Sequence, residues 1–291
     1  MRVTESNSYR NLLRDLSRIQ DRMQVSQAQV SSSKRLSKPS DDPAAAGDVV
    51  RLNGETSEVE QYLRNLDSGR GRLDFADTVL DNVGQMVERI RNLGILSMSD
   101  KSKGPLYSVE IAGLRDQIIS SSNSTYQGKF IFGGSATGVP PYLVNPDKSV
   151  TYVGNDDQVK LQINRTATLQ VQVAGSEVFS GPVDIFETAA DLLTAIDAGD
   201  QSGVNAQLEK LGAFYEGLSV NRAKVGGLVN VATTVEAELR DYQLVREEDL
   251  INLESVNLAK ALTEFTQNEN ALKAATAIGA RISGPSILDY L

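Results

Sequence analysis

The sequence has no cysteine, no histidine and no tryptophan among its 291 residues. Without cysteine the chain can form no disulfide and offers no thiol nucleophile. Without histidine as well, the Cys- or His-containing zinc sites and the Ser–His and Cys–His catalytic pairs are excluded. We therefore expect neither an enzyme nor a metal or cofactor site. A chain without cysteine also suits unfolded passage across cell envelopes, because it cannot form wrong disulfides.

Aromatic residues are also scarce, at 5% of the chain against 40% for all hydrophobic residues. That is little for a compact globule and ordinary for extended helical packing, although 291 residues allow two or three domains. No apolar run approaches the length of a membrane span, and Met1 to Asn7 lack the apolar core of a secretory signal. We expect no membrane insertion, and a cytoplasmic location unless the chain is exported without a leader.

Acidic residues outnumber basic ones, with 38 Asp and Glu against 29 Lys and Arg, a net charge of -9. Phosphate binding needs clustered Lys and Arg, and we identify no basic stripe in the sequence. The charge also fits poorly with anionic membranes. We therefore expect no nucleic-acid partner.

Both ends of the chain carry apolar residues at alternating three- and four-residue spacing, which is typical of a helix with one narrow apolar face. The N-terminal series is Tyr9, Leu12, Leu16, Ile19, Met23, Ser26, Val30 and Ser33. The C-terminal series is Leu244, Glu248, Ile251, Ser255, Leu258, Leu262, Phe265, Glu269 and Leu272. We predict that these terminal helices pair with each other and with neighbouring copies. Polar residues interrupt both series, so we expect the ends to become fully ordered only on assembly.

A strong helix start follows the first helix, at Ser40, Asp41, Asp42 and Pro43. Asp42 can cap the free N–H groups and Pro43 suits the first helical position. From there the helical spacing continues to Ile90, and it returns over 107–118, 185–196 and 204–232. These segments predict long antiparallel helical rods.

The period changes to two in the middle of the chain, where Val159, Leu161 and Ile163 alternate with polar residues. Such alternation indicates half-buried strands, and we predict four to six short ones. The predicted fold is therefore mainly α with a small central β insert. Its parts are the paired terminal helices (1–40 and 250–291), the helical rod (41–129 and 184–249) and the β insert (130–183).

Ser31 to Lys34 has the Ser-x-x-Lys form of serine acyl-enzymes, but the companion motifs are missing and a polar helix end explains it better.

Two alternatives from other classes remain open. A hydrolase carried by the β insert is the first alternative, although the insert has no histidine or cysteine to serve as nucleophile or base. A soluble coiled-coil adaptor is the second.

Several segments, spread over nearly the whole chain, resemble the flagellin superfamily. The most specific is Lys34-Arg35-Leu36 followed by Pro39 to Ala45; Leu16 to Gln20 and Phe132-Gly133-Gly134 agree with it. The end of the chain, from Glu264-Phe265 to Ser286-Ile287-Leu288-Asp289-Tyr290-Leu291, is similar to the junction members of that superfamily rather than to its filament-forming members. Tyr142, Thr151 to Gly154 and Val178-Phe179 favour the same branch.

The resemblance implies a structural component of the bacterial flagellum that joins hook to filament, with filament-forming flagellin as the alternative. The implied partners are copies of itself in a ring, hook-associated protein 1, flagellin, an export chaperone and the flagellar type III export apparatus. The implied location is extracellular, reached without a cleaved signal peptide. We expect the assembly interface in the terminal series, at Leu12, Leu16, Ile19, Met23, Val30, Ile251, Leu258, Leu262, Phe265, Leu272, Ile287, Leu288 and Leu291.

Overall fold

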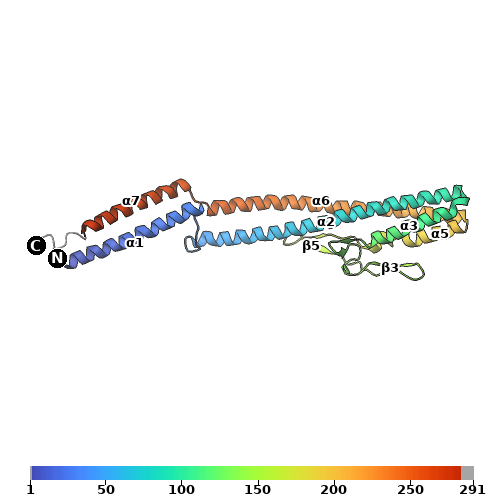
Figure 1. The fold of residues 1–291 in the computed structure, drawn as a ribbon, viewed down its shortest axis with the longest axis horizontal. Coiled ribbons are helices and arrows are strands. Elements are labelled where there is room, and N and C mark those ends of the chain that lie inside the picture. The colour runs from blue at the N-terminus through green and yellow to red at the C-terminus, as the bar shows by residue number, and fades with distance from the viewer. Residues whose placement is uncertain (1, 283–291) are drawn as a thin grey trace. The chain divides into compact units, whose positions relative to one another are not determined.

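The computed structural model describes residues 2–282, in two compact units. One unit comprises the described parts of Met1–Glu58 and Tyr242–Leu291, and the other is Val59–Asp241. The chain is mainly helical, as predicted, with the elements shown in Figure 1. The functional division into paired ends, rod and insert stays a prediction.

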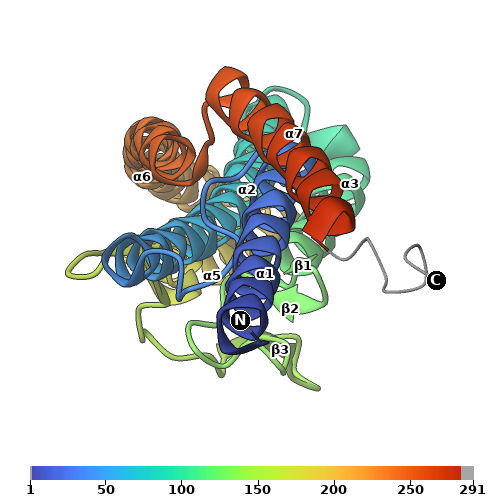
Figure 2. The same cartoon turned by 90° about the vertical axis from the view of Figure 1, so that its left-hand side faces the viewer.

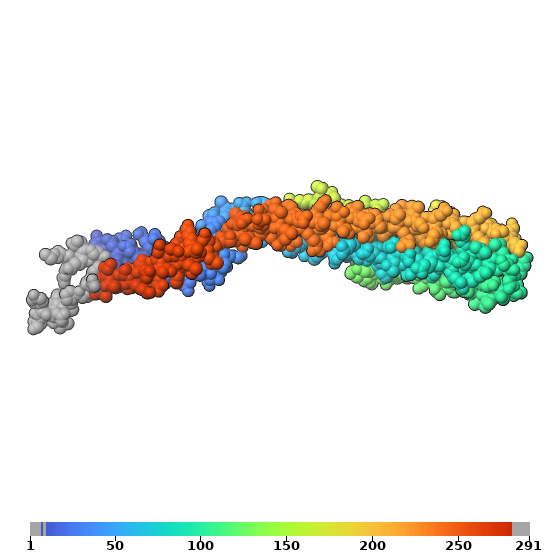
Figure 3. Space-filling model, turned by 90° about the horizontal axis from the view of Figure 1, so that it is seen from above, coloured from blue at the N-terminus to red at the C-terminus, as the bar shows by residue number. Residues whose placement is uncertain are grey.

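The first unit pairs the two ends of the chain. Helix α1 (Arg2–Ser32) lies alongside α7 (Leu258–Ile282), as Figures 2 and 3 show from two directions. The unit also contains the first part of α2 (Pro43–Ser99) and the last part of α6 (Gln201–Glu254). Helix α1 begins at Arg2, earlier than the predicted start near Ser8.

The predicted C-terminal helix is interrupted, which corrects the single apolar series proposed from residue 244 to residue 272. Helix α6 ends at Glu254 and α7 begins at Leu258. The side chain of Asn257 explains the new start, because its Oδ1 accepts a hydrogen bond of 3.1 Å from the N–H of Lys260. The predicted series is therefore divided between two helices, with residues 255–257 in the link.

The second unit is built on the long middle parts of α2 and α6, which lie side by side (Figure 1). The short 3-10 helix η1 (Lys101–Lys103), α3 (Gly104–Ser122) and α5 (Ile185–Asp197) complete its helices. One apolar core joins α2, α3, α5 and α6, and Arg222 of α6 contacts Asp77 at 3.0 Å and Asp81 at 2.6 Å on α2. The predicted long helices are confirmed here.

The β insert consists of three separate antiparallel hairpins within the described chain, rather than one sheet. They are β1 (Thr125–Tyr126) with β2 (Lys129–Phe130), β3 (Tyr142–Val144) with β4 (Val150–Tyr152), and β5 (Lys160–Gln162) with β6 (Thr168–Gln170). A short helix, α4 (Gly175–Phe179), follows them and was not predicted. Strands of two or three residues bury too little by themselves, so the insert depends on packing against its surroundings.

An aromatic cluster provides that packing. The rings of Phe132 and Phe179 lie 5.1 Å apart edge to face, and those of Tyr142 and Phe186 lie 5.1 Å apart. Burial raises the pKa of the Tyr142 hydroxyl well above its ordinary value. Because these residues belong to the same core as α2 and α6, the cluster joins the insert to the helices.

Two glycines of α2 allow the hairpins to approach the helix closely. A Cβ atom on Gly69 would lie 2.6 Å from Cγ1 of Val171, and one on Gly71 would lie closer still to the hydroxyl of Tyr126. Glycine in a helix costs about 1 kcal/mol relative to alanine. At these positions the cost is offset by contact with the insert, and Arg72 adds hydrogen bonds to the Phe130 carbonyl (3.1 Å) and Gln172 (2.8 Å).

We predict that Gly69→Ala lowers the free energy of unfolding by about 1–3 kcal/mol, because the new methyl group overlaps the stiff side chain of Val171. The matched control is Gly113→Ala on α3, where a Cβ would meet open space. There the helix propensity of alanine should raise stability by up to about 1 kcal/mol. Denaturant unfolding measures both; equal effects of the two substitutions would contradict close packing at Gly69.

Candidate assembly interface

The N-terminal series lies on the side of α1 that packs against α7. Leu12, Leu16, Ile19, Met23 and Val30 are all half-buried. A Cβ on Gly279 of α7 would lie 3.2 Å from Cδ2 of Leu12, so the helices approach closely there. The N-terminal series therefore contacts the other end of the same chain, most clearly at Leu12.

Ser26 occupies an apolar position in this series, but it is buried without penalty. Its hydroxyl donates a hydrogen bond of 2.8 Å to the carbonyl of Arg22, one turn earlier. Ser33 does not belong to the helix at all, because it has a φ of 58° in the link after α1. The helical series thus ends at Val30.

The C-terminal series is placed differently from the prediction. Ala261, which the series omitted, is only 1% exposed and contributes the most buried side chain of α7, with Phe265 and Leu272 half-buried. Leu258 and Leu262 are 45% and 49% exposed, and Ile251 of α6 is 63% exposed. These three side chains are therefore much less buried than predicted, whereas Phe265 and Leu272 of the same series are half-buried. Ile287, Leu288 and Leu291 lie outside the described residues.

The two interhelical links are joined to each other. Lys34 and Ser255 form an isolated antiparallel bridge, and the N–H of Arg35 donates to the carbonyl of Glu254 at 2.6 Å. Arg35 also donates to the carbonyl of Leu253 (3.2 Å) and pairs with Asp42 (3.1 Å). The break between α1 and α2 is therefore tied to the break between α6 and α7.

The predicted helix start is confirmed at Pro43, the first residue of α2. Asp42 accepts a hydrogen bond of 3.1 Å from the N–H of Ala45, and this bond together with Arg35 holds the pKa of Asp42 below its usual value. Asp41 has another role. Its carboxylate accepts hydrogen bonds from the N–H groups of Ser37 and Lys38 (3.0 and 2.8 Å) and so closes the preceding turn. Ser40 lies in the same turn.

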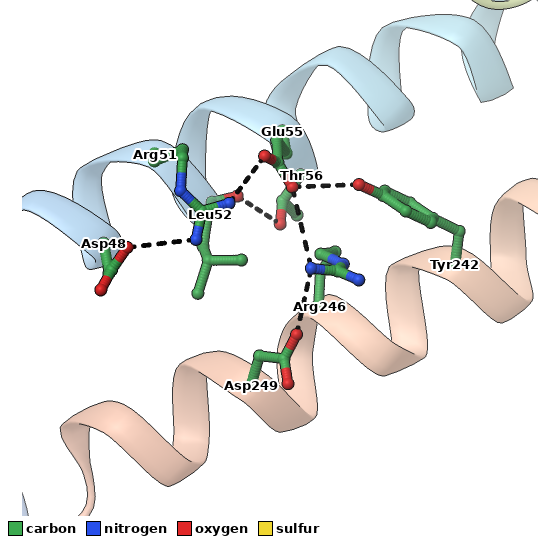
Figure 4. A network of polar contacts seen from close by, with 8 residues as sticks. All are labelled: Asp48, Arg51, Leu52, Glu55, Thr56, Tyr242, Arg246 and Asp249. Atoms are coloured by element: carbon green, nitrogen blue, oxygen red, sulfur yellow. Dashed lines mark hydrogen bonds and ion pairs between the residues drawn. The ribbon is translucent and has the colours of Figure 1, made fainter.

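A polar network joins α2 to α6 within the first unit (Figure 4). Glu55 accepts a hydrogen bond of 3.0 Å from the hydroxyl of Tyr242 and pairs with Arg51 at 2.9 Å. Arg246 lies 4.8 Å over the ring of Tyr242 and pairs with Asp249 at 3.1 Å. The Tyr242 hydroxyl and Arg51 hold the pKa of Glu55 below its ordinary value.

We predict that Glu55→Gln lowers the thermal midpoint at neutral pH. The pKa of Glu55 is lower in the folded chain than the value of 4.5 for the unfolded chain, so the carboxylate stabilises the fold above that value. This contribution is lost as the pH falls through the folded pKa, so the parent and variant should converge at acidic pH, once Glu55 is protonated in the folded chain. Calorimetry from neutral to acidic pH checks the prediction. The control is Glu60→Gln, because the Glu60 carboxylate forms an exposed ion pair with Arg64 at 3.7 Å. A constant difference at every pH would contradict it.

The structure also corrects the expectation that no basic stripe exists. Arg10, Arg14, Arg18 and Arg22 recur at four-residue intervals on α1 and are all exposed. Four-residue spacing places side chains on one side of a helix. The spacing was visible in the sequence, but the overall acidity of the chain hid it.

The described residues hold no group of three or more Asp or Glu side chains arranged for a metal ion. Among residues 2–282 no helix combines the length and apolarity needed to cross a membrane.

Comparisons with known proteins identify relatives over nearly the whole chain. The profile of the bacterial flagellin N-terminal helical region matches residues 3–137. Flagellar hook-associated protein 3 of Salmonella typhimurium is 23% identical over 316 aligned positions, covering 99% of this chain and 98% of the relative. Flagellin of Bacillus subtilis is 25% identical over 297 positions, covering 97% and 96%.

The fold is shared with a solved structure, the flagellar junction protein FlgL from Legionella pneumophila. It superposes with a TM-score of 0.61 at 13% identity, over 71% of this chain and 99% of that one. Together with the near-complete sequence matches, the shared fold confirms the resemblance found in the sequence. Over nearly its whole length the chain is similar to flagellar hook-associated protein 3, and its residues 3–137 match the bacterial flagellin N-terminal helical region.

Proposed function

We propose that the chain is the junction subunit between the flagellar hook and the filament. The observation that carries this proposal is the similarity to hook-associated protein 3 over 99% of the chain. We infer that copies of the chain form a ring that contacts hook-associated protein 1 on one side and flagellin on the other. Its relatives are structural proteins, which supports a mechanical role without catalysis.

The proposed mechanism is burial of the paired ends among neighbouring subunits. Exposed apolar residues of the first unit, among them Ile251, Leu258 and Leu262, supply surface for this purpose. Each Å² of apolar surface removed from water contributes about 25 cal/mol, so contacts repeated around a ring add up to a stable wall. We propose that the terminal helices gain their final stability in this way.

We propose that the chain reaches the flagellum through the flagellar type III apparatus, with a chaperone that holds it in the cytoplasm beforehand. Unfolded transport is compatible with the absence of cysteine, because no disulfide can form on the way. Both parts of this proposal are tested by measuring how much of the protein reaches the flagellum in cells that lack the chaperone or the type III apparatus.

A filament-forming flagellin is the second candidate, favoured by the 25% identity to the Bacillus subtilis protein. Electron microscopy after mixing purified protein with short filament seeds separates the two. The junction proposal expects that this protein does not extend the seeds. Long filaments made of this protein alone would contradict it and favour the flagellin.

A further inference from the structure

The outer side of α1 carries a basic face, which we define as Arg10, Leu13, Arg14 and Arg18. These residues are separated by three, one and four positions, which places them on one side of the helix, away from the series that packs against α7. Arg14 bonds to Asn11, and Arg18 lies 3.7 Å from Asp15 in a pair whose members are both largely exposed. Successive arginines four residues apart repel each other, which destabilises an isolated helix. An acidic surface that contacts this face would offset the repulsion between the arginines by attracting each of them.

The end of α6 carries a face of opposite charge, which we define as Leu244, Glu247, Glu248 and Ile251. These residues are separated by three, one and three positions, so they share one side of the helix. Leu244 and Ile251 are each 63% exposed. Within residues 2–282, no ion pair joins Glu247 or Glu248 to a cation, and Glu247 accepts one hydrogen bond from Gln243 (3.0 Å).

The two faces are alike in form and opposite in charge. Each mixes exposed apolar side chains with charged ones of a single sign, a composition that suits helix-to-helix contact better than free solvent exposure. The charge is also divided along the chain: the first 40 residues hold eight of the 29 Lys and Arg residues but three of the 38 Asp and Glu residues.

We propose that the basic face of α1 docks on the acidic face of α6 in a second copy of this chain. The partner is another copy because the chain itself supplies the complementary surface, and because α1 uses its opposite side for its own α7. This inference deepens the proposed function and rests on it, since it assigns one contact in the ring of copies. Charge complementarity sets which faces meet, and Leu13, Leu244 and Ile251 supply apolar contact.

Charge reversal tests the pairing. Arg14→Glu with Arg18→Glu should reduce the amount of the protein in purified flagella by about tenfold, since like charges then face each other. Adding Glu247→Arg and Glu248→Arg to the same chain restores opposite charges and should recover incorporation to within about twofold of the parent. The matched control is Arg91→Glu with Lys101→Glu, which changes the net charge equally at exposed positions outside both faces.

Immunoblots of purified flagella give the amounts, and circular dichroism checks that each variant is folded. Incorporation that is unchanged, or reduced equally by the control pair, would overturn the inference. So would a loss that the second pair of substitutions does not restore, because the basic face would then bind a different acidic component.

A second measurement separates this inference from the proposed function. Sedimentation velocity of the purified proteins at high concentration should show self-association of the parent and of the fourfold variant, but not of Arg14→Glu with Arg18→Glu. High salt should weaken the association through screening. If the parent is absent from flagella but sediments in this pattern, the proposed function fails and the contact stands. If it is present in flagella without this pattern, the contact fails and the function stands.

Discussion

Leu258→Asp combined with Leu262→Asp is expected to remove the protein from the flagellum while leaving the monomer folded. Both side chains are about half exposed, so an aspartate there meets water in the monomer. In an assembly that covers this side of α7, the same aspartates would lose their hydration without a partner, which costs several kcal/mol. We expect incorporation to fall by more than about tenfold, measured on immunoblots of purified flagella.

The adjacent residue provides a control with the opposite result. Ala261 is almost completely buried in the unit that pairs α1 with α7, so Ala261→Asp should disrupt that pairing in the monomer and reduce its helical signal in circular dichroism. The double leucine variant should retain that signal. Normal incorporation of the double variant would show that this side of α7 faces no neighbour.

Phe179→Ala is expected to have the largest effect on stability. The ring is fully buried, lies 5.1 Å from Phe132 and 5.6 Å from Tyr142, and joins the insert to the core of the helices. Removing it leaves a cavity that should lower the free energy of unfolding by about 3–5 kcal/mol. Denaturant unfolding followed by circular dichroism measures this value.

Leu143→Ala is the matched control, since Leu143 belongs to the same insert but is 45% exposed. Its effect should stay within about 0.5 kcal/mol. Because one core includes both the insert and the helices, we expect the parent and both variants to unfold in a single transition. An insert that unfolds separately, with the helical transition unchanged in Phe179→Ala, would contradict the shared core.

The sequence predicted the helices well because their signals are local. Three- and four-residue spacing identified α1, α2, α5 and α6, and the Asp42–Pro43 pair located the start of α2 to the residue. The predicted number of strands was also right, since alternation and turn residues identify short hairpins.

The errors lie where tertiary contacts decide. The helix break at 255–257 depends on Asn257 as a cap and on pairing with Ser33 and Lys34, which are far away in sequence. In the sequence alone the apolar spacing runs through this break, so Leu258 and Leu262 were predicted to be buried where the structure buries Ala261. The division of the insert into separate hairpins likewise depends on its docking at Gly69 and Gly71.

Immunogold electron microscopy of intact flagella tests the central claim most directly. An antibody to this protein should label one narrow band at the boundary between hook and filament, and cells that lack the protein should keep the hook but lose the filament. Label along the whole filament, or protein found in the cytosol alone, would contradict the proposed junction function.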